Sequence, residues 1–424
     1  MDMFRIEGPV QLSGAVTVNG SKNATLPIMA AAVLAAGKST IKSVPRLSDI
    51  LLLARLLRQL GCKVGKKENG DLSIDSTVVD NPVGEYEIVR RMRASICILG
   101  PLLARCGRAE VSMPGGCAIG DRPVNIHLRG LRELGAQIHL KNGYIIAETP
   151  NGLKGKEVFL GGPFGSTVLG TANVLMAATL AKGKTIIESA ACEPEIGDLA
   201  NCLNEMGAKI SGIGSPRLIT EGVKELQPAE YKVIPDRIEA GTFMIAAAVT
   251  SGQLQIQNCR LDDMMAVVNA LRNIGVTVES ADSGCVVSCN GPIKPADITT
   301  QPYPGFPTDL QAQFMTLLAL AQGNSVIIEK VFPDRFMHVA ELNRMAANLR
   351  KEGPAVIVAG VKSLIAAPVM ASDLRASAAL VLAGLAAHGT TIVNRVYHID
   401  RGYEKIEERL NPVGAKISRE TAQP

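Results

Sequence analysis

The sequence contains no tryptophan, and aromatic residues make up only 3% of its 424 residues. Proteins that bind single-stranded nucleic acid stack bases on aromatic side chains, so this scarcity argues against such a function. An excess of one charge is also missing, because 44 lysines and arginines nearly balance 40 aspartates and glutamates. A net charge of +4 does not provide a broad basic face for nucleic acid. Any functional positive charge must therefore be concentrated locally.

Long apolar runs and paired metal ligands are absent as well. No apolar stretch reaches the roughly 18 to 20 residues of a membrane span, and the first ten residues do not resemble a secretion signal. Nine cysteines occur without a CxxC pair, and the five histidines show no spacing typical of a metal site or a Ser/His triad. We therefore predict a cytoplasmic globular protein with reduced thiols and with no membrane or nucleic-acid partner.

The strongest pattern that is present is an internal repeat of about 70 residues, which occurs six times. Each repeat contains an apolar stretch rich in Ala, Leu and Met, then a glycine, then a β-branched segment, which is typical of a buried helix followed by a strand. A second, more polar helix with the same ending follows in each repeat, and its charged residues indicate a solvent-facing side. The glycines of the first kind are Gly37, Gly107, Gly183, Gly252, Gly323 and Gly389, and those of the second kind are Gly61, Gly135, Gly207, Gly275, Gly353 and Gly414.

Strands that alternate with one buried and one exposed helix predict an α/β fold with helices inside and sheets around them. The polar, proline-bearing stretch 227–239 lies where the third repeat gives way to the fourth, so we expect two domains of three repeats. One expected domain is residues 22–231, and the other combines residues 1–21 with 232–424. The first 19 residues are expected to form one strand that pairs with the second half of the chain.

The loop 112–123, SMPGGCAIGDRP, combines flexible residues with one thiol and one cation. Its three glycines allow backbone conformations with positive φ, and prolines lie near its two ends. This composition fits a mobile lid that carries Cys117 as a nucleophile or acid. It fits a surface turn with an incidental thiol equally well.

The six buried helices begin with an unusual set of residues. Five of the six starting positions are charged and four are cations, although the positive end of the helix dipole disfavours a cation by roughly 0.3 to 1 kcal/mol. Because this unfavourable placement of a cation recurs in several repeats, we infer that these cations have a function. Free backbone N–H groups at a helix start, together with Lys or Arg side chains, form anion sites. The alternative is that these cations reach solvent or pair with a neighbour, as Asp236 could pair with Arg237. The six positions are Lys22, Arg93, Thr167, Arg237, Asp309 and Arg375.

Three further charged residues each have a local interpretation that remains open. Asp309 could be an ordinary first-turn carboxylate after a Thr308 N-cap, and Asp373 could cap the helix that contains Arg375. Arg401 precedes an amphipathic helix, where a charged residue is commonplace.

Taken together, the motifs resemble those of the UDP-N-acetylglucosamine 1-carboxyvinyltransferases, a family of enolpyruvyl transferases, over essentially the full length. They occur in the family's order: GSKNA at Lys22 and Asn23, RRMRASI at Arg93, PGGCAIGDRP at Cys117 and Arg122, EPEI at Glu193, PDRIEAGTF at Asp236, FPTDLQAQ at Asp309, RFMHV at Arg335, SDLRAS at Asp373 and IDRGYEKI at Arg401.

The resemblance implies an inside-out α/β barrel of two domains, each built of three βαβαββ units. It implies transfer of the enolpyruvyl group of phosphoenolpyruvate to the 3-hydroxyl of UDP-N-acetylglucosamine with release of phosphate, the first committed step of peptidoglycan precursor synthesis. It also implies no cofactor and no metal, and we expect a monomer. Two alternatives are the sister transferase acting on shikimate 3-phosphate, and a non-catalytic paralogue that binds a nucleotide sugar.

The resemblance also implies the site residues. Lys22, Arg122 and Arg401 would hold the phosphate and carboxylate of phosphoenolpyruvate, Asn23 would orient the sugar, Asp309 would act as base, and Cys117 as acid or phosphate-releasing group. Further substrate contacts would come from Arg93, Pro123, Val124, Asn125, Val331, Asp373 and Arg375. Asn125 stands where the family usually has Asp, and GPFGSTVLGT replaces its usual short loop, so the chain departs from the family on the uridine side.

Overall fold

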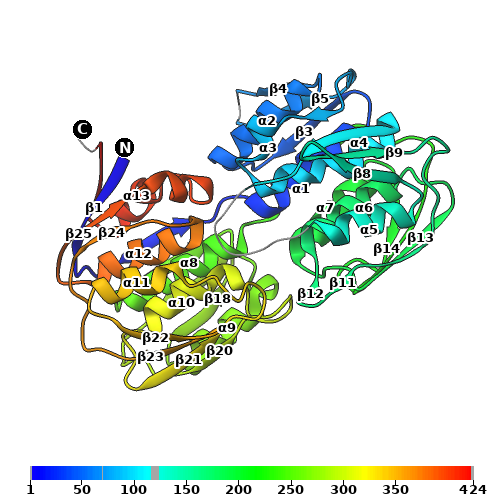
Figure 1. The fold of residues 1–424 in the computed structure, drawn as a ribbon. Helices are drawn as coiled ribbons and strands as arrows, with labels where there is room; N and C mark the ends of the chain where they lie inside the picture. Colours follow the sequence, from blue (N-terminus) through cyan, green and yellow to red (C-terminus); the bar gives the residue numbers. More distant parts are fainter. Residues whose placement is uncertain (1, 69, 116–123, 422–424) are drawn as a thin grey trace. The chain divides into compact units, whose positions relative to one another are not determined.

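The computed structural model describes residues 2–68, 70–115 and 124–421. The described chain separates into two compact units, which are coloured by sequence in Figure 1. Unit 1 contains residues 2–19 and 235–421, and unit 2 contains residues 20–115 and 124–234. The expected domain boundaries at 21/22 and 231/232 lie near these divisions, and the domain assignment itself stays a prediction.

Unit 2 contains three long buried helices, and the more polar helices lie outside them. The apolar stretches predicted as buried helices are helical, and nearly every residue of α1 and α6 is buried. In α2 most apolar residues are buried while Arg55 and Arg58 are exposed, as the polar pattern predicts, although Leu51 is exposed as well. The helices are α1 (Lys22–Ala31), α2 (Ser48–Gln59), α3 (Tyr86–Val89), α4 (Leu99–Cys106), α5 (Asn125–Glu133), α6 (Val168–Ala178) and α7 (Pro194–Glu205).

Unit 1 repeats this plan with α8, α10 and α12 as its buried helices, and these three pack against one another (Figure 1). Their Ala-rich sequences bring the helix backbones close together, and the larger Leu, Met and Phe side chains fill the space between them. The helices are α8 (Arg237–Val249), α9 (Met265–Asn273), α10 (Gln311–Leu318), α11 (Met337–Arg344), α12 (Leu374–Ala386) and α13 (Ile406–Leu410).

Six four-stranded sheets, three in each unit, share one topology in the described part of the chain. In each, an edge strand runs parallel to its neighbour, and the next two strands are antiparallel. Such mixed sheets fit a repeated unit of one crossover and one hairpin. In unit 2 the sheets are β16 (Glu230–Lys232), β3 (Lys38–Lys42), β5 (Leu72–Asp75), β4 (Lys63–Lys66); β6 (Val83–Gly84), β7 (Arg108–Ser112), β9 (Tyr144–Glu148), β8 (Gln137–Lys141); and β10 (Glu157–Phe159), β13 (Lys184–Glu188), β15 (Arg217–Glu221), β14 (Lys209–Ser211), with a small extra hairpin of β11 (Gly161–Gly162) and β12 (Gly165–Ser166).

The sheets of unit 1 use strands from both ends of the chain. The prediction that the first 19 residues pair with the second half is confirmed, but they form two strands instead of one. The first strand lies between β25 and β26, so the N and C labels are close together in Figure 1. The sheets are β2 (Ser13–Thr17), β17 (Gln253–Gln257), β19 (Gly284–Ser288), β18 (Thr277–Ala281); β20 (Asp297–Thr299), β21 (Asn324–Ile328), β23 (Ala355–Ala359), β22 (Asn348–Glu352); and β24 (Pro368–Met370), β25 (Gly389–Asn394), β1 (Asp2–Gly8), β26 (Ile417–Thr421).

The glycine pattern was wrong at one position of the second kind. Gly353 lies in the hairpin between β22 and β23, not at a helix end. The residue that follows α11 with a left-handed backbone is Ala346, with a φ of 64°. With Ala346 in place of Gly353, the separations between successive repeats become 74, 72, 68, 71 and 68 residues. The fifth repeat therefore keeps the backbone of the others without their glycine.

Gly252 also differs from the expected helix-ending glycine. The left-handed residue after α8 is Ser251, with a φ of 49°, and Gly252 is absent from the residues with positive φ in the described chain. A Cβ atom at Gly252 would lie 2.2 Å from the Leu12 carbonyl oxygen. Glycine is needed here because the backbone of the N-terminal segment approaches closely, not because of its φ.

Candidate active site

Asp309 lies at the centre of a cluster of charges in unit 1, which we call the Asp309 cluster and which comprises Asp309, Arg335, Asp373 and Arg375. Asp309 belongs to the 3-10 helix Thr308–Leu310 that leads into α10. Arg335 Nη1 donates to its Oδ1 at 2.8 Å, while Arg375 Nη2 and Nε donate to its Oδ2 at 3.1 and 3.3 Å. One carboxylate is thus held by two guanidinium groups from different repeats.

Both arginines of this cluster are buried, whereas Asp309 keeps about a quarter of its side chain exposed. Burial alone would lower the pKa of Arg335, but the charges of Asp309 and Asp373 hold that pKa above its usual value. Burial likewise opposes the charge of Arg375, and the polar groups around it, including Asp309, raise its pKa overall. Both side chains are therefore cations at neutral pH, and Asp309 is the acidic group that reaches solvent.

Asp373 is the N-cap of α12, as its local interpretation predicted. Its Oδ1 accepts the backbone N–H of Arg375 at 2.9 Å and that of Ala376 at 3.1 Å. Arg335 Nη2 lies 4.0 Å from the same oxygen. The cap and the ion pairs together fix where Arg375 enters the cluster.

The Thr308 N-cap interpretation was wrong, and this weakens the view of Asp309 as an ordinary first-turn acid. The Thr308 hydroxyl donates to Glu329 Oε2 at 2.9 Å and accepts from Arg335 Nη1 at 3.0 Å. Glu329 is fully buried and also accepts the backbone N–H of Val331 at 2.8 Å. A chain of hydrogen bonds from Arg335 through Thr308 to Glu329 therefore supports the Asp309 cluster from behind.

Arg401 ends the 3-10 helix Val396–Arg401 and is half-buried. The adjacent Gly402 and Tyr403 donate their backbone N–H groups to Ile399 O at 2.9 and 3.0 Å. Burial lowers the pKa of His398, and the charge of Arg401 lowers it further. This histidine is neutral at pH 7 beside the Arg401 cation.

In unit 2, Lys22 is the first residue of α1 and is almost completely buried. Its Nζ lies 3.6 Å from Asp49 Oδ2, and Asp49 is buried as well. The Ser21 side chain caps the helix by accepting from Ala24 N at 3.3 Å, and Asn23 is half-buried beside it. A buried cation at the positive end of a helix thus has one nearby carboxylate as partial compensation.

The described residues next to the loop 112–123 lie at its two ends. Arg93 Nη1 donates to the Pro114 carbonyl at 3.5 Å. On the other side, Val124 is buried, and Asn125 is the exposed first residue of α5. The predictions for Cys117, Arg122 and Pro123 lie outside the described residues.

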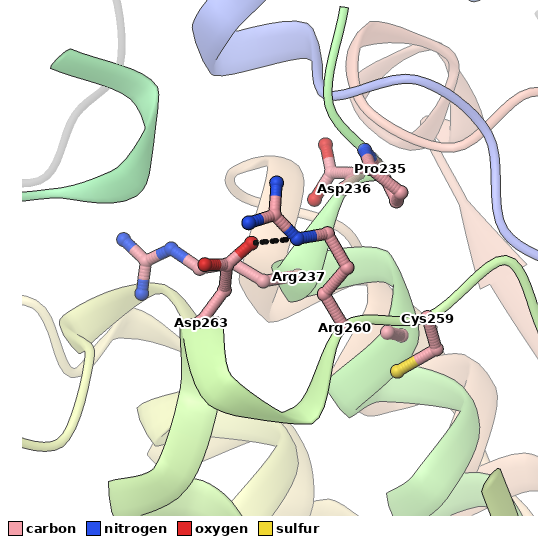
Figure 2. A pocket seen from close by; sticks show the side chains of 7 residues that line it. Pro235, Asp236, Arg237, Cys259, Arg260 and Asp263 are labelled. Carbon is pink, nitrogen blue, oxygen red and sulfur yellow. Dashed lines mark ion pairs between the residues drawn. The ribbon is translucent and has the colours of Figure 1, made fainter. Parts of the chain in front are cut away.

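A shallow surface hollow lies beside the start of α8, and Figure 2 shows its lining. Asp236 caps α8 there, accepting from Ile238 N at 2.9 Å and Glu239 N at 3.0 Å. The Arg260 Nε atom lies 3.3 Å from Asp263 Oδ2 (Figure 2). The lining includes Arg237, one of the six helix-start residues, but none of the site residues implied by the family resemblance that the structure describes.

Sequence reasoning gave no site role to three buried charges that the structure places beside predicted residues. Arg335 and Glu329 support Asp309, and Asp49 lies beside Lys22. Asp49 in the sequence RLSDI looks like any acid in the first turn of a helix, and Glu329 follows a strand like any surface acid. Arg335 stands in the RFMHV motif, which was a signal of its importance.

The fold is similar to that of solved enolpyruvyl transferases. The family model for EPSP synthase (3-phosphoshikimate 1-carboxyvinyltransferase) matches residues 6–410. The structure resembles the crystal structure of the enolpyruvyl transferase NikO from Streptomyces tendae with a TM-score of 0.90 and 24% identity, covering 100% of this chain and 99% of that one.

Sequence relatives narrow the class further. The chain is 52% identical over 419 residues to the UDP-N-acetylglucosamine 1-carboxyvinyltransferase of Methylacidiphilum infernorum, covering 99% of each. It is 53% identical over 421 residues to the enzyme of that name from Trichlorobacter lovleyi, again covering 99% of each. The chain belongs to the UDP-N-acetylglucosamine 1-carboxyvinyltransferases of the EPSP synthase family.

No helix in the described part of the chain is both long and apolar enough to cross a membrane. The cysteines that the structure describes are free thiols, as predicted. Burial raises the pKa of Cys62 to about 11 and those of Cys97 and Cys202 to about 12. These three thiols are therefore protonated and poorly reactive at neutral pH.

Proposed function

We propose that the protein transfers the enolpyruvyl group of phosphoenolpyruvate to the 3-hydroxyl of UDP-N-acetylglucosamine and releases phosphate. This is the first committed step of peptidoglycan precursor synthesis. The observation that carries the proposal is the identity of about half of all residues with enzymes of this name over almost the whole chain. The site agrees with it, because the Asp309 carboxylate is solvent-accessible and held by two buried cations.

The addition step requires a base and a proton donor. Asp309 accepts the proton of the sugar 3-hydroxyl as the hydroxyl oxygen bonds to C2 of phosphoenolpyruvate, and the C3 methylene takes up a proton, for which the Cys117 thiol is the proposed acid, to become a methyl group. The paired arginines hold the Asp309 carboxylate in one orientation, so little reorganisation is needed when the reaction begins. Because both oxygens of Asp309 accept hydrogen bonds, the angle of its carboxylate is fixed before substrate arrives.

The elimination step breaks the bond between C2 and the phosphate oxygen, and the methyl group loses a proton as the carbon–carbon double bond returns. Cys117 serves as acid or as the group that helps phosphate to leave. Lys22, Arg122 and Arg401 bind the phosphate and carboxylate of phosphoenolpyruvate and stabilise the charge that develops at C2. The leaving group is carried by the substrate, so no metal or organic cofactor is required.

The remaining residues bind the sugar nucleotide or support those that do. Asn23 orients the sugar, and Arg93 holds the backbone at Pro114 next to the loop that carries Cys117. Asp373 and Arg375 contact the substrate, and Arg375 also orients Asp309 through its bonds to Oδ2. Pro123, Val124, Asn125 and Val331 complete the contacts to the nucleotide and sugar.

The finer description of the fold is part of the same proposal. The two units correspond to two domains, residues 22–231 and residues 1–21 with 232–424, each an inside-out α/β barrel of three βαβαββ units. The buried helices and the six sheets of one topology support this description. We further propose a cytoplasmic monomer.

Phosphate release tests the activity directly. The protein is mixed with phosphoenolpyruvate and either UDP-N-acetylglucosamine or shikimate 3-phosphate, and inorganic phosphate is measured over time. Release only with the sugar nucleotide supports the proposal. Release only with shikimate 3-phosphate, or no release with either acceptor, contradicts it.

Selective alkylation tests the role of Cys117. An epoxide that carries a phosphonate mimics phosphoenolpyruvate and should modify Cys117 faster when UDP-N-acetylglucosamine is present, with the adduct located by mass spectrometry. Cys97 and Cys202 provide internal controls, because burial raises the pKa of each to about 12. Modification spread evenly over the nine cysteines, or indifferent to the sugar nucleotide, would mean that the loop is an ordinary surface turn.

A further inference from the structure

Tyr403 is a buried tyrosine, 1% exposed, whose hydroxyl lies among the three central helices of unit 1. Its oxygen is 2.8 Å from Thr242 Oγ1 of α8 and 3.2 Å from Gln313 Nε2 of α10. Its ring lies 5.3 Å from the guanidinium carbon of Arg375 of α12. One side chain therefore contacts all three buried helices, and nothing in the mechanism above assigns it a role.

The direction of these hydrogen bonds follows from the number of available protons. Thr242 Oγ1 donates its single proton to the Ile238 carbonyl at 2.8 Å. Tyr403 is then the donor in its contact with Thr242, and its oxygen can accept from Gln313 Nε2, which also lies 3.2 Å from Thr242 Oγ1. Burial raises the pKa of Tyr403, which keeps this proton in place at neutral pH. The hydroxyl is thus used both as donor and as acceptor.

Gln313 connects Tyr403 to the proposed base. The same Nε2 that donates to Tyr403 also donates to the backbone carbonyl of Asp309 at 3.0 Å. The side chain of Asp309 is held by Arg375, and Arg375 packs on the Tyr403 ring. Tyr403 therefore supports Asp309 along two routes, one to its backbone and one to its carboxylate.

Tyr403 is also close in sequence to the proposed phosphoenolpyruvate ligand Arg401. Gly402 between them has no room for a side chain, because a Cβ atom there would lie 2.4 Å from Leu374 Cδ1. Leu374 is the first residue of α12. With Gly402 packed on α12 and Tyr403 bonded to α8 and α10, the backbone that ends in Arg401 has little freedom.

We propose that Tyr403 is a positioning residue that fixes Asp309 and Arg401 relative to each other, so that the base and one phosphoenolpyruvate contact keep a common geometry. This inference rests on the proposed function for the roles of Asp309 and Arg401. The coupling itself depends only on the contacts of Tyr403. Removing the hydroxyl should disturb both residues at once, although neither is altered chemically.

The test is Tyr403→Phe in the full-length protein, which keeps the ring under Arg375 and removes only the hydroxyl. We expect kcat to fall about tenfold and the KM for phosphoenolpyruvate to rise severalfold, because small misplacements of reacting groups are costly. The KM for UDP-N-acetylglucosamine should change less than about twofold. A purely structural role would lower the melting temperature and leave kcat and both KM values unchanged, and that result would overturn the proposal.

Tyr231→Phe is the matched control. Tyr231 lies in unit 2 and donates its hydroxyl proton to Asp198 Oδ1 at 2.7 Å, so the substitution also removes one hydrogen bond of a partly buried tyrosine. It should affect stability and leave the kinetic constants of the folded protein unchanged. Equal kinetic losses in both variants would show that any lost tyrosine hydrogen bond slows the enzyme, and would contradict a special role for Tyr403.

A double-mutant cycle in urea unfolding makes the inference independent of turnover. If Tyr403 holds Asp309, the combined loss of stability in Tyr403→Phe with Asp309→Asn should be smaller than the two single losses together. This coupling is expected even if the protein releases no phosphate with UDP-N-acetylglucosamine, a result that would refute the proposed function alone. Additive losses would refute the positioning role whatever the activity.

Discussion

The two units use different polar groups between their central helices. In unit 2, Asn173 of α6 donates to Ile96 O at 2.9 Å, accepts from Gly100 N at 2.8 Å and bonds His127 Nδ1 at 3.0 Å. The two backbone partners in that network are uncharged amide groups. In unit 1 the corresponding centre contains Gln313 and Tyr403 in contact with Arg375, which bonds the carboxylate of Asp309.

The difference is that the centre of unit 1 contains buried charged side chains, whereas the Asn173 network of unit 2 is made of hydrogen bonds to backbone amides and His127. An amide network that is fully hydrogen-bonded adds specificity at little cost, whereas buried charges lose hydration that their ion pairs restore only in part. Arg335 and Arg375 of unit 1 are buried, and both are turned toward Asp309. In unit 2, Lys22 with Asp49 is a buried ion pair at the start of a central helix. We infer that the buried charged residues are retained for catalysis or substrate binding, and that the Asn173 network stabilises the fold.

Removing the charge at the centre of unit 1 should give the largest effect. We expect Asp309→Ala to lower kcat by about 10² to 10⁴, the usual range for loss of a general base, and to destabilise the fold because two buried arginines lose their shared partner. Steady-state kinetics and urea unfolding measure the two effects. Asp198→Ala in unit 2 removes another buried carboxylate and should lower stability only. A normal rate in Asp309→Ala would contradict the assignment of the buried charges of unit 1 to catalysis.

The pH dependence of stability should reveal the titration of Glu239, another buried carboxyl group of unit 1. Burial raises the pKa of Glu239 to about 7, against the opposing effect of Arg409, and the Asp236 charge raises it further. Because the folded pKa lies above the unfolded value of about 4.3, Glu239 binds its proton more tightly in the folded state. Stability should therefore fall as pH rises from about 4.3 to 7, by about 3 to 4 kcal/mol in total.

Urea unfolding at pH 5.5 and at pH 8 measures the upper part of this range. Glu239 accepts from the backbone N–H of Asn19 at 2.7 Å and pairs with Arg409, so Glu239→Gln will also change those contacts. The informative quantity is the difference between the two pH values, which should shrink in Glu239→Gln. An equal difference in both proteins would assign the slope to other groups.

A substitution of Arg401 tests whether this half-buried charge of unit 1 contributes to catalysis without contributing to the stability of the fold. We expect Arg401→Ala to raise the KM for phosphoenolpyruvate about 10- to 100-fold or to lower kcat, with the melting temperature nearly unchanged. Arg395→Ala removes an exposed arginine from the same segment and should leave the kinetics intact. If both variants behave alike, the local interpretation of Arg401 as an ordinary surface charge is restored.

The Asn173 network of unit 2 should show the reverse behaviour. Asn173→Ala leaves the Gly100 N–H and the Ile96 carbonyl buried without this partner, at a cost of about 2 to 3 kcal/mol. The kinetic constants per folded molecule should stay unchanged. Asn173→Asp keeps an acceptor for Gly100 and should lose less if that bond dominates. A large kinetic defect in Asn173→Ala would place this network in the catalytic machinery.

The smallest expected effect concerns the one repeat whose outer helix ends without glycine. Ala346→Gly should stabilise the protein by about 0.5 to 1 kcal/mol, since a left-handed backbone is strained for alanine and free for glycine. Gly275 holds the equivalent place one repeat earlier, and a Cβ atom added there would meet only the Pro292 carbonyl oxygen, at 3.5 Å. Gly275→Ala should therefore lose a similar amount. Urea unfolding measures both variants, and changes of the same sign would contradict this account.

The repeats, the two kinds of helix and the helix starts could be predicted from the sequence because they depend on local chemistry. Apolar all-round stretches must be buried, and Asp373 sits one residue before α12, where a cap belongs. The end of the outer helix in the fifth repeat was misassigned because Gly353 is followed by Pro, which is typical of a helix end. Alanine, by contrast, is uncommon at such an end, so Ala346 was not considered. Both residues have a left-handed backbone, with φ values of 57° and 64°, so only their places distinguish them: Ala346 follows α11, and Gly353 lies in the hairpin between β22 and β23.

The Asp309 cluster was only partly predictable. Asp309 and Arg375 were identified by their repeated position and by family motifs, but their contact joins residues 66 apart in the sequence. Glu329 bonds Thr308, which lies 21 residues earlier, and Tyr403 bonds Thr242, which lies 161 residues earlier, so no local pattern encodes these contacts. Lys22 was expected at a helix start, whereas the burial of its partner Asp49 could not be distinguished from an exposed first-turn acid.

The place of β1 has a consequence for how the chain is made. β1 pairs with β25 on one side and with β26 on the other, so β1, which precedes unit 2 in the sequence, completes its sheet only with two strands that follow unit 2. All the strands and helices of unit 2 lie between them in sequence and need neither. On the ribosome, all segments of unit 2 therefore emerge before unit 1 is complete. The edges of β1 stay unpaired until β25 and β26 have emerged.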